Sequence, residues 1–530
     1  MGTGNGCDLF GTVQIADSYC NLFNKPADGA FGEALISQLS PAFQLDGLYG
    51  VTDKPFEFRI NSANNGAASS SNEGLMTVVS GPDAGSFATL RSNRSLRYRP
   101  GQGSLCRITA MFPNGFTRGY QQLAGFLNQS DILGVGFNFG DPTISQTKRE
   151  EFAILRRQNS KAEVAQFTIT NPAGPAGENV NVILNNVSFP VTFPAGVGTT
   201  PEEAVAFLGS QTYTGWIVDY YDDKIFFLFN GPPQNLTGLF QITSDGQLTA
   251  TYNELQAGEA PNDNWTYQSD FNIDKLDGTG HSKMTIDPTR LNVFCIDFRW
   301  LGAGRIRYSI EDPETGCIFP FHIESYSNQN RVPHISNPSM RIGYGVVNQR
   351  PDLGTGQGVV VQGASMMGAI EGKIVRNTTT RAVSRDIAGN LVANQEHHIL
   401  SLKDNRIILE GRPNVLNQRE LIITSISAAI NGGNNTDPIK IVLYKNATFN
   451  SDLVFSSINT FGAFSTTTAL ADPNQNDNVI GTFYVSPDQA TTIDLLELRV
   501  ILVPTDIVSI VTFCPKQTTG TGVSINFEVE

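Results

Sequence analysis

The sequence predicts a mainly β protein in which a small α/β module interrupts a larger β domain and a second β domain follows. Two observations lead to this fold class. Short segments of alternating polar and apolar residues recur along the chain, as in half-buried strands. Charged residues make up only 16% of the composition while glycine occurs 51 times, which favours strands and turns over long helices. A chain of 530 residues exceeds one ordinary core, so we expect several domains.

Residues 1–50 are irregular and rich in glycine, which indicates an N-terminal arm or attachment segment. One short helix is expected near FGEALISQL. A disordered leader is an equally good interpretation of this segment, since chain ends without a packed face rarely order.

The first β domain is expected over residues 51–162 and 263–350. Its first part contains FEFRI, LMTVV, SLRYRP, LCRITAMF and EFAILRRQ, which are short alternating segments separated by turn-forming residues. In its second part, NVFCIDFRWLGAGRIRYSI predicts a hairpin with Phe294, Ile296 and Phe298 on an apolar face. We expect that face to pack in a sandwich core.

The dense basic cluster of this acidic chain also lies in the first β domain, and its members are Arg91, Arg94, Arg97, Arg99 and Arg107. Guanidinium groups bind oxyanions in fixed geometry, so one hypothesis is an anion-binding or sialic-acid-like site. The alternative, which we favour, is that these charges pair with carboxylates of neighbouring strands or of another subunit.

A small α/β module is expected over residues 163–262. Strand-like segments flank TTPEEAVAFLGSQ, which predicts a helix with Thr200 as N-cap and Pro201 at the first helical position. The following hairpin carries the carboxylates Asp219, Asp222 and Asp223. They can bind a cation, but a solvated hairpin tip is the commoner outcome for such residues.

Residues 351–395 have little periodicity and many small residues, so we expect a linker or shoulder there. Residues 396–530 then contain about eight strand-like segments and no clear helix, a pattern that predicts a C-terminal antiparallel β-sandwich.

The charge and the motifs bear on whole classes of function. A net charge of −14 argues against binding nucleic acid, and no apolar run reaches the ~20 residues of a membrane span. No GxSxG, HExxH or GxxxxGK[ST] pattern occurs, so we expect no enzyme, no catalytic or metal-binding residues and no cofactor. The six cysteines lack CxxC spacing and are expected as free thiols.

Several longer motifs resemble virion structural proteins of tailed phages and large double-stranded DNA viruses. They are GEALISQLSPAFQLDGLYG, LRYRPGQGSLCRITAMF, RWLGAGRIRYSIEDPETG, YSNQNRVPHISNPSM, KIVLYKNATFN and GVSINFEVE. The resemblance covers most of the chain and implies a jelly-roll or lectin-like β-sandwich, interrupted by the α/β module and followed by a second sandwich. It transfers architecture and a broad role, and no active site.

This resemblance implies a fibre or spike component on the virion surface, assembled in the host cytoplasm, that contributes to host attachment. The expected partners are further copies of the chain, with a trimer favoured, other virion proteins, and a host surface glycan or protein. Two alternatives stay open. One is a purely structural capsid decoration, baseplate or tail connector protein, and the other is a polysaccharide-degrading particle enzyme, which needs two carboxylates across a cleft.

Overall fold

The fold is mainly β, as the sequence predicts: strands make up 53% and helices 4% of the computed structural model. The structure describes residues 39–48, 50–51, 58–70, 73–83, 85–141, 143–349, 358–372, 379–388, 391–408, 415–431, 437–458, 462–467, 479–486, 489–496, 500–516 and 520–530. The helix expected near FGEALISQL lies outside these residues, apart from Leu39, which begins a strand.

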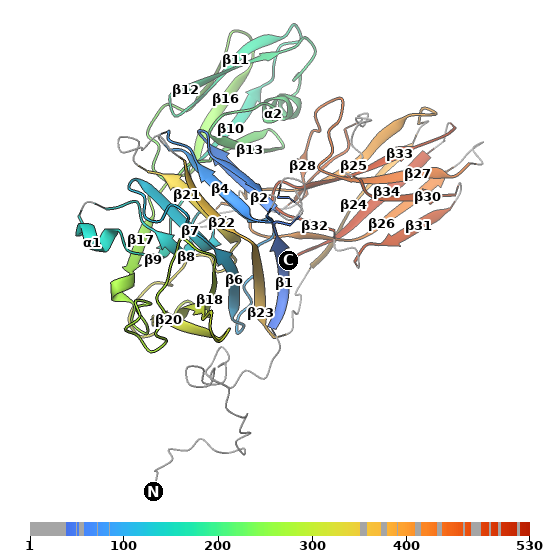
Figure 1. The fold of residues 1–530 in the computed structure, drawn as a ribbon. Helices are drawn as coiled ribbons and strands as arrows, with labels where there is room; N and C mark the ends of the chain where they lie inside the picture. The colour runs from blue at the N-terminus through green and yellow to red at the C-terminus, as the bar shows by residue number, and fades with distance from the viewer. Residues whose placement is uncertain are drawn as a thin grey trace.

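Two antiparallel sheets form the first β-sandwich (Figure 1). The seven-stranded sheet has the order β17 (Asn262–Tyr267), β9 (Ala153–Gln158), β8 (Ile132–Phe137), β7 (Tyr120–Leu127), β21 (Ile342–Asn348), β5 (Phe87–Ser92), β2 (Phe58–Ala63). The six-stranded sheet has the order β1 (Leu39–Asp46), β23 (Ser365–Glu371), β6 (Ser104–Ala110), β18 (Asn292–Phe298), β19 (Ile306–Glu311), β20 (Ile318–Glu324). A small sheet of β22 (Val359–Gly363), β4 (Met76–Ser80) and β3 (Ala67–Ser70) completes this part, together with the short helices α1 (Gln146–Arg149) and η2 (Gln268–Asp270).

The predicted hairpin is confirmed as β18 and β19, with Ile296 paired to Tyr308. Phe294, Ile296 and Phe298 are buried in the sandwich core, as their alternation predicts. On the opposite face Asp297 accepts from Arg307 Nε at 2.8 Å, so the polar side of the hairpin neutralises part of its own charge.

The expected linker of residues 351–395 contains β22, β23 and β24 (Thr379–Ala388), and the expected arm contains β1. β23 lies between β1 and β6 in the six-stranded sheet. Its small residues give no alternating polar and apolar pattern, so the strand is not evident from the sequence. The fold needs small residues there for close packing, since a Cβ at Gly368 would lie 2.7 Å from Phe43 Cζ.

The module of residues 163–262 has its own apolar core between two small sheets and one helix. The helix α2 (Pro201–Gly209) begins with a capping box in which Glu203 N donates to Thr200 Oγ1 at 3.2 Å, as the sequence predicts. Its strands are β10 (Val164–Asn171), β11 (Glu178–Leu184), β12 (Val187–Phe193), β13 (Trp216–Tyr221), β14 (Lys224–Phe229), β15 (Gln241–Ser244) and β16 (Thr249–Gln256).

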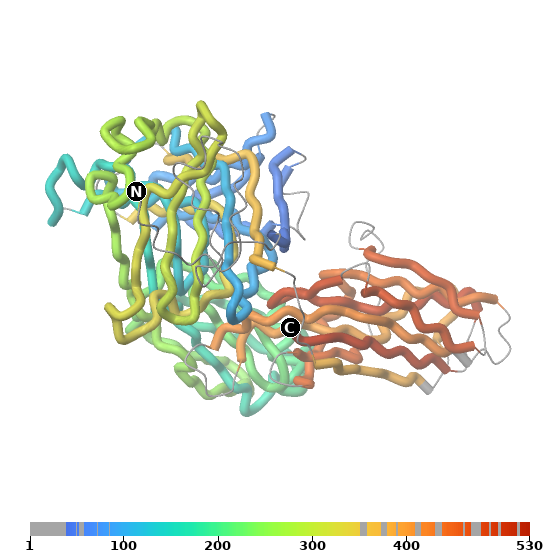
Figure 2. The backbone as a smooth tube through the Cα atoms, turned by 90° about the horizontal axis from the view of Figure 1, so that it is seen from below, coloured from blue at the N-terminus to red at the C-terminus, as the bar shows by residue number. Residues whose placement is uncertain are grey.

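Two further antiparallel sheets enclose a separate core and form the C-terminal sandwich, which projects from the rest of the molecule (Figure 2). One sheet contains β24 (Thr379–Ala388), β34 (Gly520–Val529), β26 (Leu421–Asn431), β31 (Ala490–Asp494) and β32 (Ile501–Leu502). The other contains β28 (Ser456–Ser457), β29 (Gly462–Ser465), β25 (Glu396–Asp404), β33 (Ile507–Phe513), β27 (Ile439–Lys445) and β30 (Val479–Val485).

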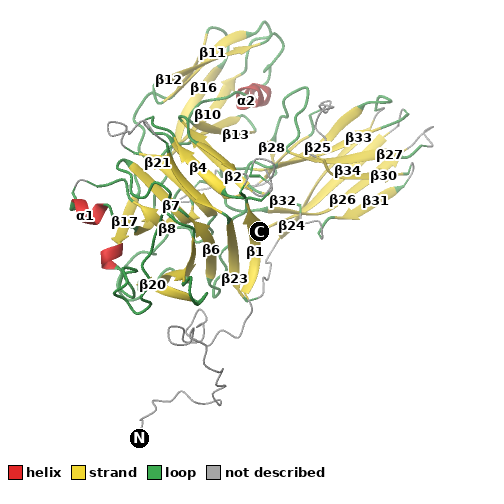
Figure 3. Cartoon of the chain, viewed as in Figure 1, coloured by secondary structure: helices red, strands yellow, loops and turns green. Residues whose placement is uncertain are grey.

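The module and the C-terminal sandwich lie side by side (Figure 3), and apolar residues from both form one buried cluster. Asp219 accepts from Lys403 Nζ at 3.0 Å, and both side chains are at most 5% exposed. The same carboxylate accepts from the backbone N–H of Arg406 at 2.8 Å. Asp219 therefore anchors two parts of the chain, and in the described residues no group of His, Cys, Asp or Glu could hold a metal ion.

The expectation of free thiols holds at Cys106, Cys295 and Cys514, which are buried. It is wrong at Cys317, which is disulfide-bonded. The spacing along the chain does not reveal such a bond, because a disulfide depends on proximity in the fold.

Candidate functional site

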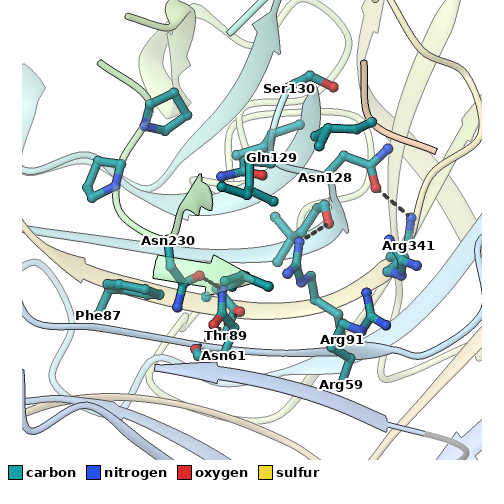
Figure 4. Close-up of a pocket in the computed structure, with 18 of the residues that line it drawn as sticks. Arg59, Asn61, Phe87, Thr89, Arg91, Asn128, Gln129, Ser130, Asn230 and Arg341 are labelled. Carbon is teal, nitrogen blue, oxygen red and sulfur yellow. Dashed lines mark hydrogen bonds between the residues drawn. The ribbon is translucent and has the colours of Figure 1, made fainter. Parts of the chain in front are cut away.

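A cavity of about 440 Å³ lies where the first sandwich, the α/β module and the C-terminal sandwich meet. The outer face of the seven-stranded sheet forms its floor (Figure 4). One wall comes from residues 230–233 of the module, and another from residues 416–418 and 504–505 of the C-terminal sandwich. The site is thus built from all three parts of the chain.

Alternation along the strands determines which side chains reach this cavity. On β5, Leu90 points into the sandwich core while Thr89 and Arg91 line the cavity. Leu123 and Leu127 give the floor an apolar area. Gly345 leaves room beside them, since a Cβ there would lie 3.5 Å from Thr89 Cγ2 and 3.7 Å from Leu127 Cδ1.

Five arginines line the cavity. Arg157 pairs with Asp263, with 2.6 Å between Nε and Oδ1, and the cluster consists of the other four: Arg59, Arg91, Arg341 and Arg406. Arg59 and Arg91 are directly opposite in the β2–β5 register, a like-charge pair that destabilises a sheet. Figure 4 shows both beside Arg341, and Arg406 follows β25 in the C-terminal sandwich. The cluster therefore combines charges from two sandwiches.

The guanidinium groups of this cluster reach neutral acceptors. Arg59 Nη2 donates to Pro504 O at 2.9 Å, Arg91 Nη1 donates to Leu127 O at 3.4 Å, and Arg341 Nε donates to Asn93 O at 3.1 Å. Among the described residues none of the four forms an ion pair, and Arg91 Nε is buried without a hydrogen-bond partner.

Burial lowers the pKa of each of these arginines. Repulsion from other arginines lowers the pKa of Arg91, Arg341 and Arg406 further, whereas Asp506 and Asp404 oppose the shift of Arg59. Burial is the larger cause and the Arg59 charge the second, and together they lower the pKa of Arg91 to about 10. The same two causes lower the pKa of Arg406 to about 9, against the opposing effect of Asp219. Arg91 and Arg406 therefore remain cations at neutral pH, at a cost to the folded state.

The carboxylates nearest to the cluster have other partners. Asp219 pairs with Lys403 at 3.0 Å, and Asp506 pairs with Lys445 at 2.9 Å. Asp404 accepts from Asn417 Nδ2 at 2.7 Å, and burial raises its pKa well above the usual range. In the part of the chain that the structure describes, no acidic residue lines the cavity, so these residues do not neutralise its positive charge from within.

Neutral amides occupy the remaining wall near the apolar floor. Asn128 Nδ2 donates to Ser339 O at 2.9 Å, and Gln129 Nε2 donates to Phe229 O at 3.2 Å. Asn61 of β2 donates to Asn230 of the module (Figure 4). Gln121 Nε2, also at the cavity, is buried without a hydrogen-bond partner.

The arginines singled out in the sequence separate into three places. Arg91 lines the cavity. Arg94 Nη2 lies 3.4 Å from Glu420 Oε2, and Arg99 pairs with Glu530, both across the boundary with the C-terminal sandwich. Arg97 lies near the same two carboxylates, although burial is the larger influence and lowers its pKa. Arg107 is exposed on β6, so the five do not form one site.

Three members of the cavity cluster, Arg59, Arg341 and Arg406, were not among the arginines that the sequence singled out. Each is isolated among apolar or neutral residues, as in FRI, MRI and NRI. An arginine in an alternating strand normally faces solvent, so no local signal shows that these three converge.

No protein-family model matches the chain, and no curated protein matches it. Among solved structures, it is similar to the metal-free carbohydrate recognition domain of Emp46p, at 7% identity and TM-score 0.25, over 62% of this chain and 97% of that chain. Arcelin-5, a lectin-like defence protein from Phaseolus vulgaris, matches at 7% identity and TM-score 0.22, over 62% and 98%. A structure described as the triple jelly roll fold and turret assembly in an archaeal virus matches at 8% identity and TM-score 0.14, over 94% and 98%. With such low TM-scores, these likenesses support no shared function.

Proposed function

We propose that this chain is a structural protein of a virus particle, displayed on its surface, that contributes to host attachment by binding anionic groups. One observation carries the attachment role: four arginines that have no ion-pair partner among the described residues open into a cavity of a chain whose net charge is −14. A desolvated cationic site attracts anions more strongly than an exposed one because the local dielectric is low.

The particle role rests on the motifs that resemble virion structural proteins, and their positions support a structural task. RWLGAGRIRYSIEDPETG spans the loop and second strand of the β18–β19 hairpin, and in YSNQNRVPHISNPSM the buried His334 and Ile335 lie at the sandwich core. Such residues hold a β-framework together. The proposal extends to assembly in the host cytoplasm and to a homo-oligomer, with a trimer favoured, among other virion proteins.

A purely structural role, as a capsid decoration, baseplate or tail connector protein, is the second candidate. The observation in its favour is the buried contact between the module and the C-terminal sandwich, where Lys403 Nζ lies 4.6 Å from the Tyr220 ring centroid and pairs with Asp219. Rigid coupling of this kind suits a load-carrying component. The polysaccharide-degrading alternative finds no support at this cavity, whose lining includes no carboxylate.

The test applies the purified full chain to a glycan array and, separately, to host envelope material in a hydrolysis assay. We expect signal on acidic glycans, weaker at high salt, without cleavage. Silence in both assays would favour the purely structural role. Release of sugars would favour the enzyme and overturn the proposal.

A further inference from the structure

The four-arginine cavity has more positive charge than one carboxylate can neutralise. Arg59, Arg91 and Arg341 come from the first sandwich and Arg406 from the C-terminal sandwich. Guanidinium groups are planar forks that match the oxygens of phosphate and sulfate. Convergence of four forks therefore favours a group with several charged oxygens over a single carboxylate.

The rest of the lining adds a second requirement. Leu123 and Leu127 provide an apolar floor, while Asn61, Asn128 and Asn230 provide amide groups beside it. A saccharide ring has the matching combination, with an apolar face and hydroxyl groups at its edge. A volume of about 440 Å³ is within the usual range of small-molecule pockets, about 300–1,000 Å³.

We infer that this cavity binds a tetrahedral oxyanion ester, a sulfate or phosphate, carried on a saccharide. The inference rests on the proposed attachment role and names the ligand class of that site. The anionic group lies against the arginines, and the sugar lies on the leucine floor beside the amides.

Binding also joins the two sandwiches. The charge of Arg406 repels Arg59 and Arg341 across the boundary between them, and these repulsions contribute to the lowered pKa values of Arg341 and Arg406. A bound dianion replaces this repulsion with attraction on both sides. Ligand binding therefore stabilises the arrangement of the two sandwiches, and the melting temperature rises with ligand concentration.

The experiment measures binding by calorimetry and melting temperature on the full chain at constant ionic strength. The probes are sodium sulfate, inorganic phosphate, a sulfated heparin-derived disaccharide, mannose 6-phosphate, an uncharged disaccharide and sialyllactose. We expect the sulfated or phosphorylated sugar to bind at least tenfold more tightly than the uncharged sugar and sialyllactose. The stronger of the two ester arms identifies the source of the oxyanion.

Two variants locate the binding. Arg91→Gln removes one cavity charge, and its matched control Arg290→Gln removes an arginine whose side chain is 84% exposed in another part of the molecule. Arg91→Gln should weaken binding of the preferred ester at least tenfold, and Arg290→Gln by less than twofold. If Arg91→Gln does not fold, Gly345→Leu provides the test, because its side chain enters the cavity without changing the charge.

Equal losses in Arg91→Gln and Arg290→Gln, or unchanged binding in Gly345→Leu, would overturn the inference. So would sialyllactose binding as tightly as the esters. The attachment proposal fails separately: an array silent on every glycan contradicts it even if the cavity binds mannose 6-phosphate. Conversely, an array signal that Arg91→Gln leaves intact preserves attachment and removes this cavity as its site.

Discussion

Two groups of arginines, close in sequence, differ in how their charge is balanced. Arg94 and Arg99 contact the C-terminal sandwich and pair with Glu420 and Glu530. Arg91, three residues before Arg94, faces a cavity with no acidic lining residue. The first group holds two parts of the chain together. The second group, the cavity cluster to which Arg91 belongs, leaves positive charge available for a ligand at the same boundary.

The difference shows what an uncompensated charge signifies in this chain. Asp and Glu number 50 against 36 Lys and Arg, so carboxylates are plentiful. The nearest ones instead serve Lys403, Lys445 and Asn417. Buried arginines that have no ion-pair partner among the described residues cost stability, and a site that retains them is a candidate for binding an anion from outside.

The largest effect is expected where a paired charge is broken deep in the molecule. Lys403→Met keeps most of the side-chain volume but leaves the Asp219 carboxylate buried without its cation. We expect the free energy of unfolding to fall by about 3–5 kcal/mol, measured by urea denaturation. Adding Asp219→Asn should recover most of this loss, since the unpaired carboxylate is then gone. An unchanged urea midpoint in Lys403→Met would mean that the paired Lys403–Asp219 site does not differ in stability from the unpaired cavity arginines.

Acid should destabilise the fold without involving either arginine group. Burial is the larger cause that lowers the pKa values of His322, His334 and His398 to about 4. Below about pH 6.5 these histidines take up protons only when the chain unfolds, so their contribution to stability is complete above pH 6.5 and declines as pH falls towards 4. Each contributes up to about 3 kcal/mol to this decline.

The free energy of unfolding of the native chain and of His398→Gln is measured by urea denaturation between pH 7 and pH 4. The difference between the two isolates one histidine from the carboxylates that titrate in the same range. The free energy of unfolding should fall less steeply with decreasing pH in His398→Gln than in the native chain. The slope should be unchanged in Arg91→Gln, because arginines stay charged throughout. Identical slopes in the native chain and His398→Gln would contradict the neutral, buried state of this residue.

A smaller loss is expected at the boundary pairs. Arg99→Gln leaves Glu530, whose side chain is 10% exposed, without its cation. We expect the free energy of unfolding to fall by about 1.5–3 kcal/mol in urea denaturation. The matched substitution Arg290→Gln, at an exposed pair with Asp287, should produce no measurable change. Equal changes in the free energy of unfolding of Arg99→Gln and Arg290→Gln would mean that the boundary pairs stabilise the fold no more than surface pairs do.

The sequence predicted those features of the fold that depend on local periodicity and capping. Alternation revealed the β18–β19 hairpin, and the Thr200–Glu203 capping box revealed α2. Alternation did not reveal β23, because the small residues of that strand carry no amphipathic signal. Alternation predicts a strand only where polar and apolar side chains alternate along it. A strand that packs through small residues, such as β23, has no such alternation.

The candidate site was predictable only in part, since it depends on long-range contacts. Arg91 was recognised within a basic stretch, but the separation of Arg91 from Arg94 depends on Glu420, 326 residues further along the chain. Arg406 reaches the cavity through the docking of the C-terminal sandwich. One sequence holds no information on that docking, so sequence proximity alone does not show which arginines line the cavity.

The smallest effect, and the one of opposite sign, concerns the cavity itself. In Arg91→Gln without ligand, the repulsion with Arg59 disappears. Because burial and this repulsion lower the pKa of Arg91 to about 10, its charge opposes folding at neutral pH. We expect no loss of stability, and a gain of up to about 2 kcal/mol, in urea denaturation without sulfate or phosphate. A loss as large as that of Arg99→Gln would show that Arg91 is a structural residue and that the two groups do not differ.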